Sequence, residues 1–212
     1  MAQCRELYDS VLGGNAKKAH DATQAAIEAG IAPMTLITES LVPAMDEVGR
    51  LFEAEEYFVP ELLLAGRAMK SAMELLRPLL ASTGEKMSTR VIIGTVKGDL
   101  HDIGKNIVAS MLEGSGFDVV DLGSDVAPER FVTAVEEYEP QFVCMSALLT
   151  VTIPAMKTTI DALNAAGLRA RVKVLVGGAP VTSRYANEIG ADGYSGSASG
   201  AVTLVRNMVA TA

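Results

Sequence analysis

The chain has 212 residues, of which 49% are hydrophobic and 21% are charged. This length suits two small domains, and the hydrophobic share is large enough for a packed core, which excludes a disordered chain. The net charge of −8 argues against a nucleic-acid binder, because each phosphate contact requires a lysine or an arginine.

The beginning of the chain lacks a basic segment, a continuous apolar core and a cleavage site, and no apolar run reaches the length of a membrane span. We therefore expect neither a secretory signal nor a membrane anchor. Cys4 and Cys144 form no CxxC pattern, and free thiols suit a reducing compartment. The sequence thus predicts a cytoplasmic protein.

Residues 1–82 have the pattern of a four-helix bundle. Gly13-Gly14 and Gly30 are predicted to end the first two helices. Pro33 and Pro60 mark the starts of the next two, because a proline in the first helical turn loses no intrahelical hydrogen bond. Apolar residues recur at spacings of three and four, which predicts that each helix buries one face.

Residues 83–89 are small and polar without periodicity, so we expect a linker there, and residues 90–212 change to short apolar runs separated by amphipathic segments. Strands are predicted at 91–96, 117–122, 142–148, 172–178 and 191–197, and helices at 104–115, 128–138, 153–166, 183–189 and 201–210. This alternation predicts an α/β domain with a doubly wound, flavodoxin-like or Rossmann-like sheet of five parallel strands. Ligands of such sheets bind beyond the carboxyl ends of the strands.

Directly after the first predicted strand, Asp99, His101 and Asp102 are expected at this ligand-binding edge. An imidazole binds a transition metal through one ring nitrogen, and the other nitrogen then needs an acceptor, which Asp99 can supply. Asp-x-His alone favours a local hydrogen-bonded pair that only shapes the turn. Because no second cluster of ligands stands at a suitable spacing, a metal bound here must bring most of its own ligands, as a tetrapyrrole-type macrocycle does.

The order of motifs resembles a known signature: Asp99-x-His101-x-x-Gly104, then Ser146-x-Leu148 after the third strand, then Gly177-Gly178 after the fourth. Cobalamin-binding domains that displace the cofactor's own base share this order. The resemblance implies that His101 is the lower axial ligand of cobalt and that Thr152, commonly a serine in methionine synthase, hydrogen-bonds Asp99. It implies these cofactor-binding residues: Asp102, Ile103, Gly104, Ser146, Leu148, Thr150, Gly177, Gly178, Tyr194 and Ser199.

Several of these residues also have an expected physical task. Gly104 permits a tight turn into a helix beneath the macrocycle, and Asp102 is expected to cap the exposed amides of that helix. Gly177 and Gly178 are expected to leave room for the displaced nucleotide tail.

Residues 48–69 resemble the helical bundle that covers the upper cobalt face in methionine synthase and in methyl-carrying corrinoid proteins. By position, Phe52 and Val59 would lie over the methyl group. Helical spacing alone favours a place in the bundle core for Phe52, Phe58 and the methionines of this segment.

The resemblance implies a protein that carries a methyl group on the cobalt of cobalamin or a related corrinoid, cycling between cobalt(I) and methyl-cobalt(III). Its partners would be a substrate-specific methyltransferase, an acceptor methyltransferase of the tetrahydrofolate or thiol type and a reductive activation protein. No residue of the chain is expected to be catalytic by itself.

Two alternatives remain open from the sequence. One is the cobalamin subunit of an adenosylcobalamin-dependent mutase, which shares the sheet-domain signature but does not generally carry the helical cap. The other is a cobalamin sensor, whose output domain usually binds DNA.

Overall fold

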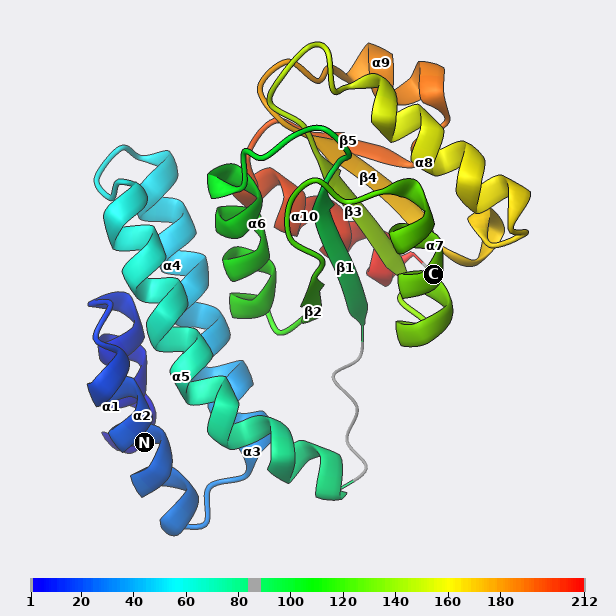
Figure 1. Cartoon of the computed structure of the whole chain (residues 1–212). Helices are drawn as coiled ribbons and strands as arrows, with labels where there is room; N and C mark the ends of the chain where they lie inside the picture. The colour runs from blue at the N-terminus through cyan, green and yellow to red at the C-terminus, as the bar shows by residue number, and fades with distance from the viewer. Residues whose placement is uncertain (1, 84–88, 212) are drawn as a thin grey trace. The chain divides into compact units, whose positions relative to one another are not determined.

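The fold is that of a computed structural model, which describes residues 2–83 and 89–211 (Figure 1). The chain forms two compact units, Met1–Ser88 with Ser110–Phe117, and Thr89–Ala109 with Asp118–Ala212. The linker expected at 83–89 falls mostly on residues 84–88, which lie outside the described residues. No described helix is both long and apolar enough to cross a membrane.

The first unit contains the four predicted helical stretches. Its elements are α1 (Ala2–Leu12), α2 (Ala16–Glu28), α3 (Pro33–Leu36), the π-helical segment η1 (Ile37–Leu41), α4 (Val42–Glu53) and α5 (Val59–Thr83). The predicted breaks are present: α1 ends before Gly13-Gly14, and Gly30 has a φ of 79°, a left-handed conformation that glycine adopts without a steric penalty. Pro33 and Pro60 lie in the first turns of their helices.

The π-helical segment was not predicted. At its end the N–H of Val42 donates to the carbonyl of Ile37, five residues earlier. The next residue, Pro43, has no N–H, and its ring crowds the carbonyl four residues before it, so a regular helix is disfavoured at this point. A widened turn lets α3, η1 and α4 continue as one helical stretch.

The second unit is a doubly wound α/β domain. Its strands are β1 (Arg90–Thr95), β2 (Asp118–Asp121), β3 (Phe142–Ser146), β4 (Lys173–Gly177) and β5 (Gly193–Ser195); its helices are α6 (Ile103–Gly114), α7 (Pro128–Tyr138), α8 (Pro154–Ala165), the 3-10 turn η2 (Arg169–Arg171), α9 (Ser183–Ile189) and α10 (Ala198–Ala210). In the part of the chain that the structure describes, the strands form one five-stranded parallel sheet in the order β2-β1-β3-β4-β5. The predicted α/β class and flavodoxin-like topology are therefore confirmed.

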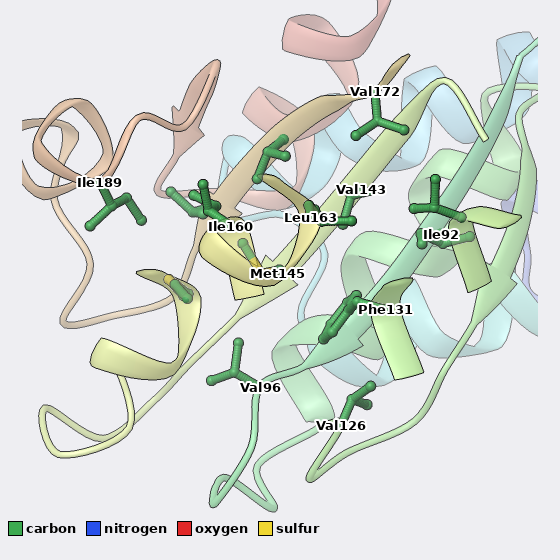
Figure 2. Close-up of a cluster of buried hydrophobic side chains, with 14 of the residues drawn as sticks. Ile92, Val96, Val126, Phe131, Val143, Met145, Ile160, Leu163, Val172 and Ile189 are labelled. Atoms are coloured by element: carbon green, nitrogen blue, oxygen red, sulfur yellow. The ribbon is translucent and has the colours of Figure 1, made fainter. Parts of the chain in front are cut away.

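Both faces of this sheet are covered, since consecutive residues of β1 from Val91 to Thr95 are buried, as expected for an all-parallel arrangement. On one face, Phe131 of α7 and Leu163 of α8 are fully buried against Ile92, Val143 and neighbouring strand residues (Figure 2). Helices α6 and α10 lie on the opposite side of the sheet (Figure 1). Because helices cover both faces of the sheet, a ligand is expected at the carboxyl ends of the strands.

Candidate functional site

One row of residues crosses the sheet where the strands end. Thr95 of β1 pairs with Ser146 of β3, Ser146 with Gly177 of β4, and Gly177 with Ser195 of β5. The strand order reverses between β1 and β3, and ligands of flavodoxin-like sheets bind at this switch point. The loops that follow β1 and β3 carry Asp99, His101 and Thr152, so the candidate site lies there.

Asp99 is fully buried, and its carboxylate joins the two loops. Its Oδ2 accepts hydrogen bonds from the N–H of Leu148 at 2.7 Å, the N–H of Leu149 at 3.2 Å and the hydroxyl of Thr152 at 2.7 Å. Its Oδ1 accepts from the backbone N–H of His101 at 3.0 Å. A buried carboxylate needs this number of donors, because desolvation without hydrogen bonds is costly.

Burial by itself would raise the pKa of Asp99. The hydrogen bonds from Thr152, from the N–H of Leu148 and from both nitrogen donors of His101 outweigh burial, so the pKa of Asp99 lies well below its usual range. Asp99 is therefore a carboxylate at every physiological pH and acts only as an acceptor.

His101 differs from Asp99 in being half exposed, with 50% of its side chain accessible. Its Nδ1 lies 2.7 Å from Oδ1 of Asp99. Because the ionised Asp99 can only accept, we assign the ring proton to Nδ1, which leaves the lone pair of Nε2 free. This is the arrangement of a metal-binding histidine oriented by a carboxylate.

Thr95, which the sequence analysis did not single out, also holds the loop that carries His101. It is fully buried, and its Oγ1 donates to the carbonyl of His101 at 3.1 Å. The hydroxyl of Ser146 lies 2.9 Å from Thr95 Oγ1. Since the single proton of Thr95 is used by His101, Ser146 donates to Thr95 and retains its lone pairs as acceptors.

The loops around His101 expose apolar side chains. Leu100 is 73% exposed, Ile103 67% and Val151 80%, and Leu148 and Leu149 are exposed as well. Large apolar side chains left in water beside a polar centre indicate a ligand with an apolar face. Gly104 adds space, because a Cβ there would meet no atom within 4 Å.

Gly177 and Gly178 have a reason within the chain itself. A Cβ at Gly177 would lie 2.7 Å from the carbonyl oxygen of Ser195, and one at Gly178, where φ is 125°, would lie 2.0 Å from that of Ala147. The sequence-based interpretation assigned both glycines to a passing nucleotide tail. The close packing of β4 against the ends of β3 and β5 requires Gly177 and Gly178 even without a bound nucleotide tail.

The remaining expected site residues are placed as follows. Asp102 accepts the first helical hydrogen bond of α6 through its backbone carbonyl, from the N–H of Asn106 at 2.8 Å, and the hydrogen bonds of the described residues include no cap by its side chain. Thr150 is exposed in the loop after β3. Tyr194 lies on β5 beside Val176, and Ser199 lies in the first turn of α10.

Phe52 lies near the end of α4 and Val59 at the start of α5, and both are half-buried. They belong to the first unit, whereas Asp99 and His101 belong to the second. The expected place of Phe52 and Val59 above a bound methyl group therefore stays a prediction.

A metal at this site needs ligands from elsewhere. Within residues 2–83 and 89–211, no group of three or more His, Cys, Asp and Glu side chains is placed to hold a metal ion. His101 offers one nitrogen, surrounded by apolar side chains. These features fit a macrocycle that brings a metal ion with most of its own ligands and would take one further ligand from the imidazole.

The fold and the residues at the β1/β3 switch point fit the class of proteins that bind a metal-carrying macrocycle. A family described as "B12 binding domain" matches residues 89–205, and a second family of the same description matches residues 3–77. The two matches cover the sheet domain and the helical stretches separately.

Similar proteins extend over almost the whole chain. Trimethylamine corrinoid protein 2 of Methanosarcina acetivorans is 43% identical over 93% of this chain and 92% of its own length, and dimethylamine corrinoid protein 1 of the same organism is 40% identical over 97% and 98%. The methanol:cobalamin methyltransferase complex MtaBC of Methanosarcina barkeri contains a chain with a TM-score of 0.88 and 30% identity, over 100% of this chain and 81% of that one. This chain belongs to the corrinoid proteins of methyltransferase systems, and its cofactor is a corrinoid.

Proposed function

We propose that this protein carries a methyl group between two methyltransferases, with Nε2 of His101 as the lower axial ligand of the corrinoid cobalt. When bound, the corrinoid supplies a cobalt that takes up and releases the methyl group, passing between cobalt(I) and methyl-cobalt(III). The observation that carries the proposal is the pairing of a half-exposed His101 with the fully buried Asp99 at 2.7 Å.

Asp99 has two tasks in this proposal. Its Oδ1 holds the proton of His101 on Nδ1, which directs the lone pair of Nε2 toward the ligand. Its Oδ2 is held in turn by Thr152 and the N–H groups of Leu148 and Leu149, so the carboxylate cannot swing away. The negative charge also makes the imidazole a stronger electron donor.

The exposed residues around His101 receive the corrinoid. Leu100, Ile103 and Leu148 offer an apolar surface, and Gly104 leaves space for close approach. Ser146 and Thr150 offer hydroxyl oxygens to amide groups of the ligand. Gly177, Gly178, Tyr194 and Ser199, with Asp102 at the start of α6, complete the proposed binding residues.

We assign the helical unit to protection of the methyl group, with Phe52 and Val59 over the upper face of the corrinoid. The relatives named corrinoid proteins cover the helical stretches as well as the sheet domain. This coverage favours a methyl carrier over the mutase subunit and the sensor that the sequence left open.

The proposed partners follow from the relatives. A substrate-specific methyltransferase loads the methyl group, and the names of the amine corrinoid proteins make methylated amines the first donors to test. An acceptor methyltransferase of the tetrahydrofolate or thiol type removes the group, and a reductive activation protein restores the cofactor. A cytoplasmic location is part of the same proposal.

The histidine assignment is tested on the full chain loaded with hydroxocobalamin and reduced to cobalt(II). We expect nitrogen superhyperfine splitting in the electron paramagnetic resonance spectrum, altered when the protein contains nitrogen-15-labelled histidine. His101→Ala should lose this protein-derived splitting. His20→Ala is the matched control, since His20 is the chain's other histidine and is half exposed. Splitting that persists in His101→Ala and still changes with nitrogen-15-labelled histidine would show that a histidine other than His101 ligates cobalt.

The carrier function is tested by transfer of a labelled methyl group. The chain is loaded with the corrinoid, reduced to cobalt(I), and incubated with a trimethylamine or a dimethylamine methyltransferase and the matching methyl-labelled amine, whose demethylated amine is the leaving group. We expect label on the corrinoid with an amine donor and its release when an acceptor methyltransferase is added. Absence of label with every donor, in a protein that binds the corrinoid, would refute the carrier role.

A further inference from the structure

The short loop that carries Asp99 and His101 has a second anchor outside the Asp99 carboxylate. Residues 97–102 belong to no helix or strand, and the loop turns through Gly98, whose φ is 83°. We propose that Asp125, in the loop between β2 and α7, is a positioning residue that holds this loop so that His101 reaches cobalt. This inference rests on the proposal that His101 is the cobalt ligand.

Asp125 contacts the loop through both its side chain and its backbone. Its Oδ1 accepts a hydrogen bond from the N–H of Gly98 at 2.7 Å, and its own N–H donates to the carbonyl of Asp99 at 2.9 Å. Lys97 Nζ lies 3.4 Å from the same Oδ1. Three consecutive residues before the ligand are thus tied to one aspartate.

The contacts of Asp125 complement those of Thr152. Strands β2 and β3 lie on opposite sides of β1 in the sheet. The loop after β3 holds the side chain of Asp99 through Thr152, whereas the loop after β2 holds the backbone of Asp99 through Asp125. Because Asp99 Oδ1 orients the ring of His101, movement of either side of Asp99 would displace Nε2.

Asp125 is suited to positioning rather than to core stability. Its side chain is 42% exposed, so its removal opens no cavity. Its backbone has a φ of 54°, a conformation that is uncommon for residues other than glycine but is enriched in aspartate and asparagine. This conformation lets the N–H and the carboxylate of one residue face the same loop.

Three substitutions separate the possible roles of Asp125. Asp125→Gly removes the carboxylate and keeps the left-handed backbone without strain, whereas Asp125→Asn keeps an acceptor for the N–H of Gly98. Lys97→Ala is the matched control that removes only the exposed ion pair. Asp125→Ala provides a second loss of the carboxylate, so the test does not depend on the folding of one variant.

The measurement is the cobalt(II) spectrum of each full-length variant loaded with hydroxocobalamin, together with its thermal midpoint. We expect Asp125→Gly and Asp125→Ala to raise the ratio of histidine-free to histidine-bound cobalt by roughly ten-fold, as loss of an orienting group does at other metal sites. Asp125→Asn and Lys97→Ala should resemble the wild type. A merely structural role would lower the midpoint and leave this ratio unchanged.

The outcomes separate this inference from the proposed function. If the wild type shows protein-derived nitrogen splitting, His101→Ala loses it, and both carboxylate-free variants keep it in full, the positioning role of Asp125 is refuted and the ligand assignment stands. A loss of equal size in Asp125→Asn would also refute the role, because the hydrogen bond to Gly98 would not be the cause. If the wild type shows no splitting from histidine, both proposals fail.

Discussion

The hydroxyl of Thr152 lies 2.7 Å from Oδ2 of Asp99, although 53 positions separate the two residues in the chain. The same hydroxyl lies 2.8 Å from the carbonyl of Leu149, but its single proton serves only one acceptor, and the buried carboxylate is the stronger one. Thr152 therefore stabilises the ionised Asp99 in the folded protein.

We expect Thr152→Val to destabilise the corrinoid-free protein by about 1.5–3 kcal/mol, because a hydrogen bond to a buried charge is lost. Thr152→Ser keeps the hydroxyl and should remain close to the wild type. Urea unfolding of the two variants measures the difference. Equal unfolding midpoints for the valine and serine variants would show that Asp99 does not depend on this hydrogen bond.

Gly178 should tolerate no side chain. Gly178→Ala places a Cβ 2.0 Å from the carbonyl oxygen of Ala147 at a φ of 125°, so we expect a loss of more than about 3 kcal/mol or a failure to fold. Thermal unfolding of the corrinoid-free chain measures the loss. A stable Gly178→Ala protein would contradict the close approach of the ends of β3 and β4.

Gly104 should behave in the opposite way. Its Cβ position is empty, so Gly104→Ala should raise the stability of the corrinoid-free protein by about 0.5–1 kcal/mol through the higher helix propensity of alanine. If the open space receives the corrinoid, the same change should weaken hydroxocobalamin binding. Thermal unfolding and a binding titration test the two effects separately, and unchanged binding would remove Gly104 from the proposed contact residues.

The two cysteines should react very differently with iodoacetamide. Cys144 is buried in β3, and burial raises the pKa of its thiol to about 12, which lowers its thiolate fraction roughly 1,000-fold relative to a thiol of pKa 9.0. Cys4 is partly exposed. We expect mass spectrometry at pH 8 to find label on Cys4 alone in the folded protein and on both cysteines in denaturant. Rapid labelling of native Cys144 would contradict its burial.

We expect the buried hydroxyl of Ser40 to make the folded protein less stable than an alanine would. It lies in η1, is fully buried, and its hydroxyl has no hydrogen-bond partner among the residues that the structure describes. We expect Ser40→Ala to stabilise the protein by about 1 kcal/mol, because a desolvated donor is removed. Thr23→Ala is the matched control, since its buried hydroxyl donates to Ala19 and its loss should be destabilising. Urea unfolding in which both variants are equally destabilised would refute the prediction for Ser40.

Much of the fold could be predicted because its signals are local. Helix α7 was predicted at 128–138 and is found at Pro128–Tyr138, since a proline in the first turn and an apolar periodicity fix the helix without reference to distant residues. The π-helical segment before Pro43 was not predicted. Proline excludes a regular hydrogen bond there, but packing decides whether the chain kinks, breaks or widens its turn.

The residues of the candidate site were likewise predicted only in part from the sequence. Asp99, His101 and Gly104 were found from their order along one loop, and Thr152 from the resemblance to cobalamin-binding domains. Thr95 and Asp125 were missed, because a strand threonine and a loop aspartate carry no distinguishing local signal. Their contacts with His101 and Gly98 arise only when the loop after β1 meets its neighbours.

The sequence by itself determined the α/β topology, the order of motifs and the position of the histidine at a strand's carboxyl end, because periodicity, turn residues and spacing act over short stretches of chain. The tertiary structure alone decided that Asp99 is fully buried while His101 remains half exposed. It also decided that Gly178 lies too close to the backbone of Ala147 for any side chain, whereas Gly104 faces open space. These properties depend on atoms brought together from separate strands, and no local pattern records such distances.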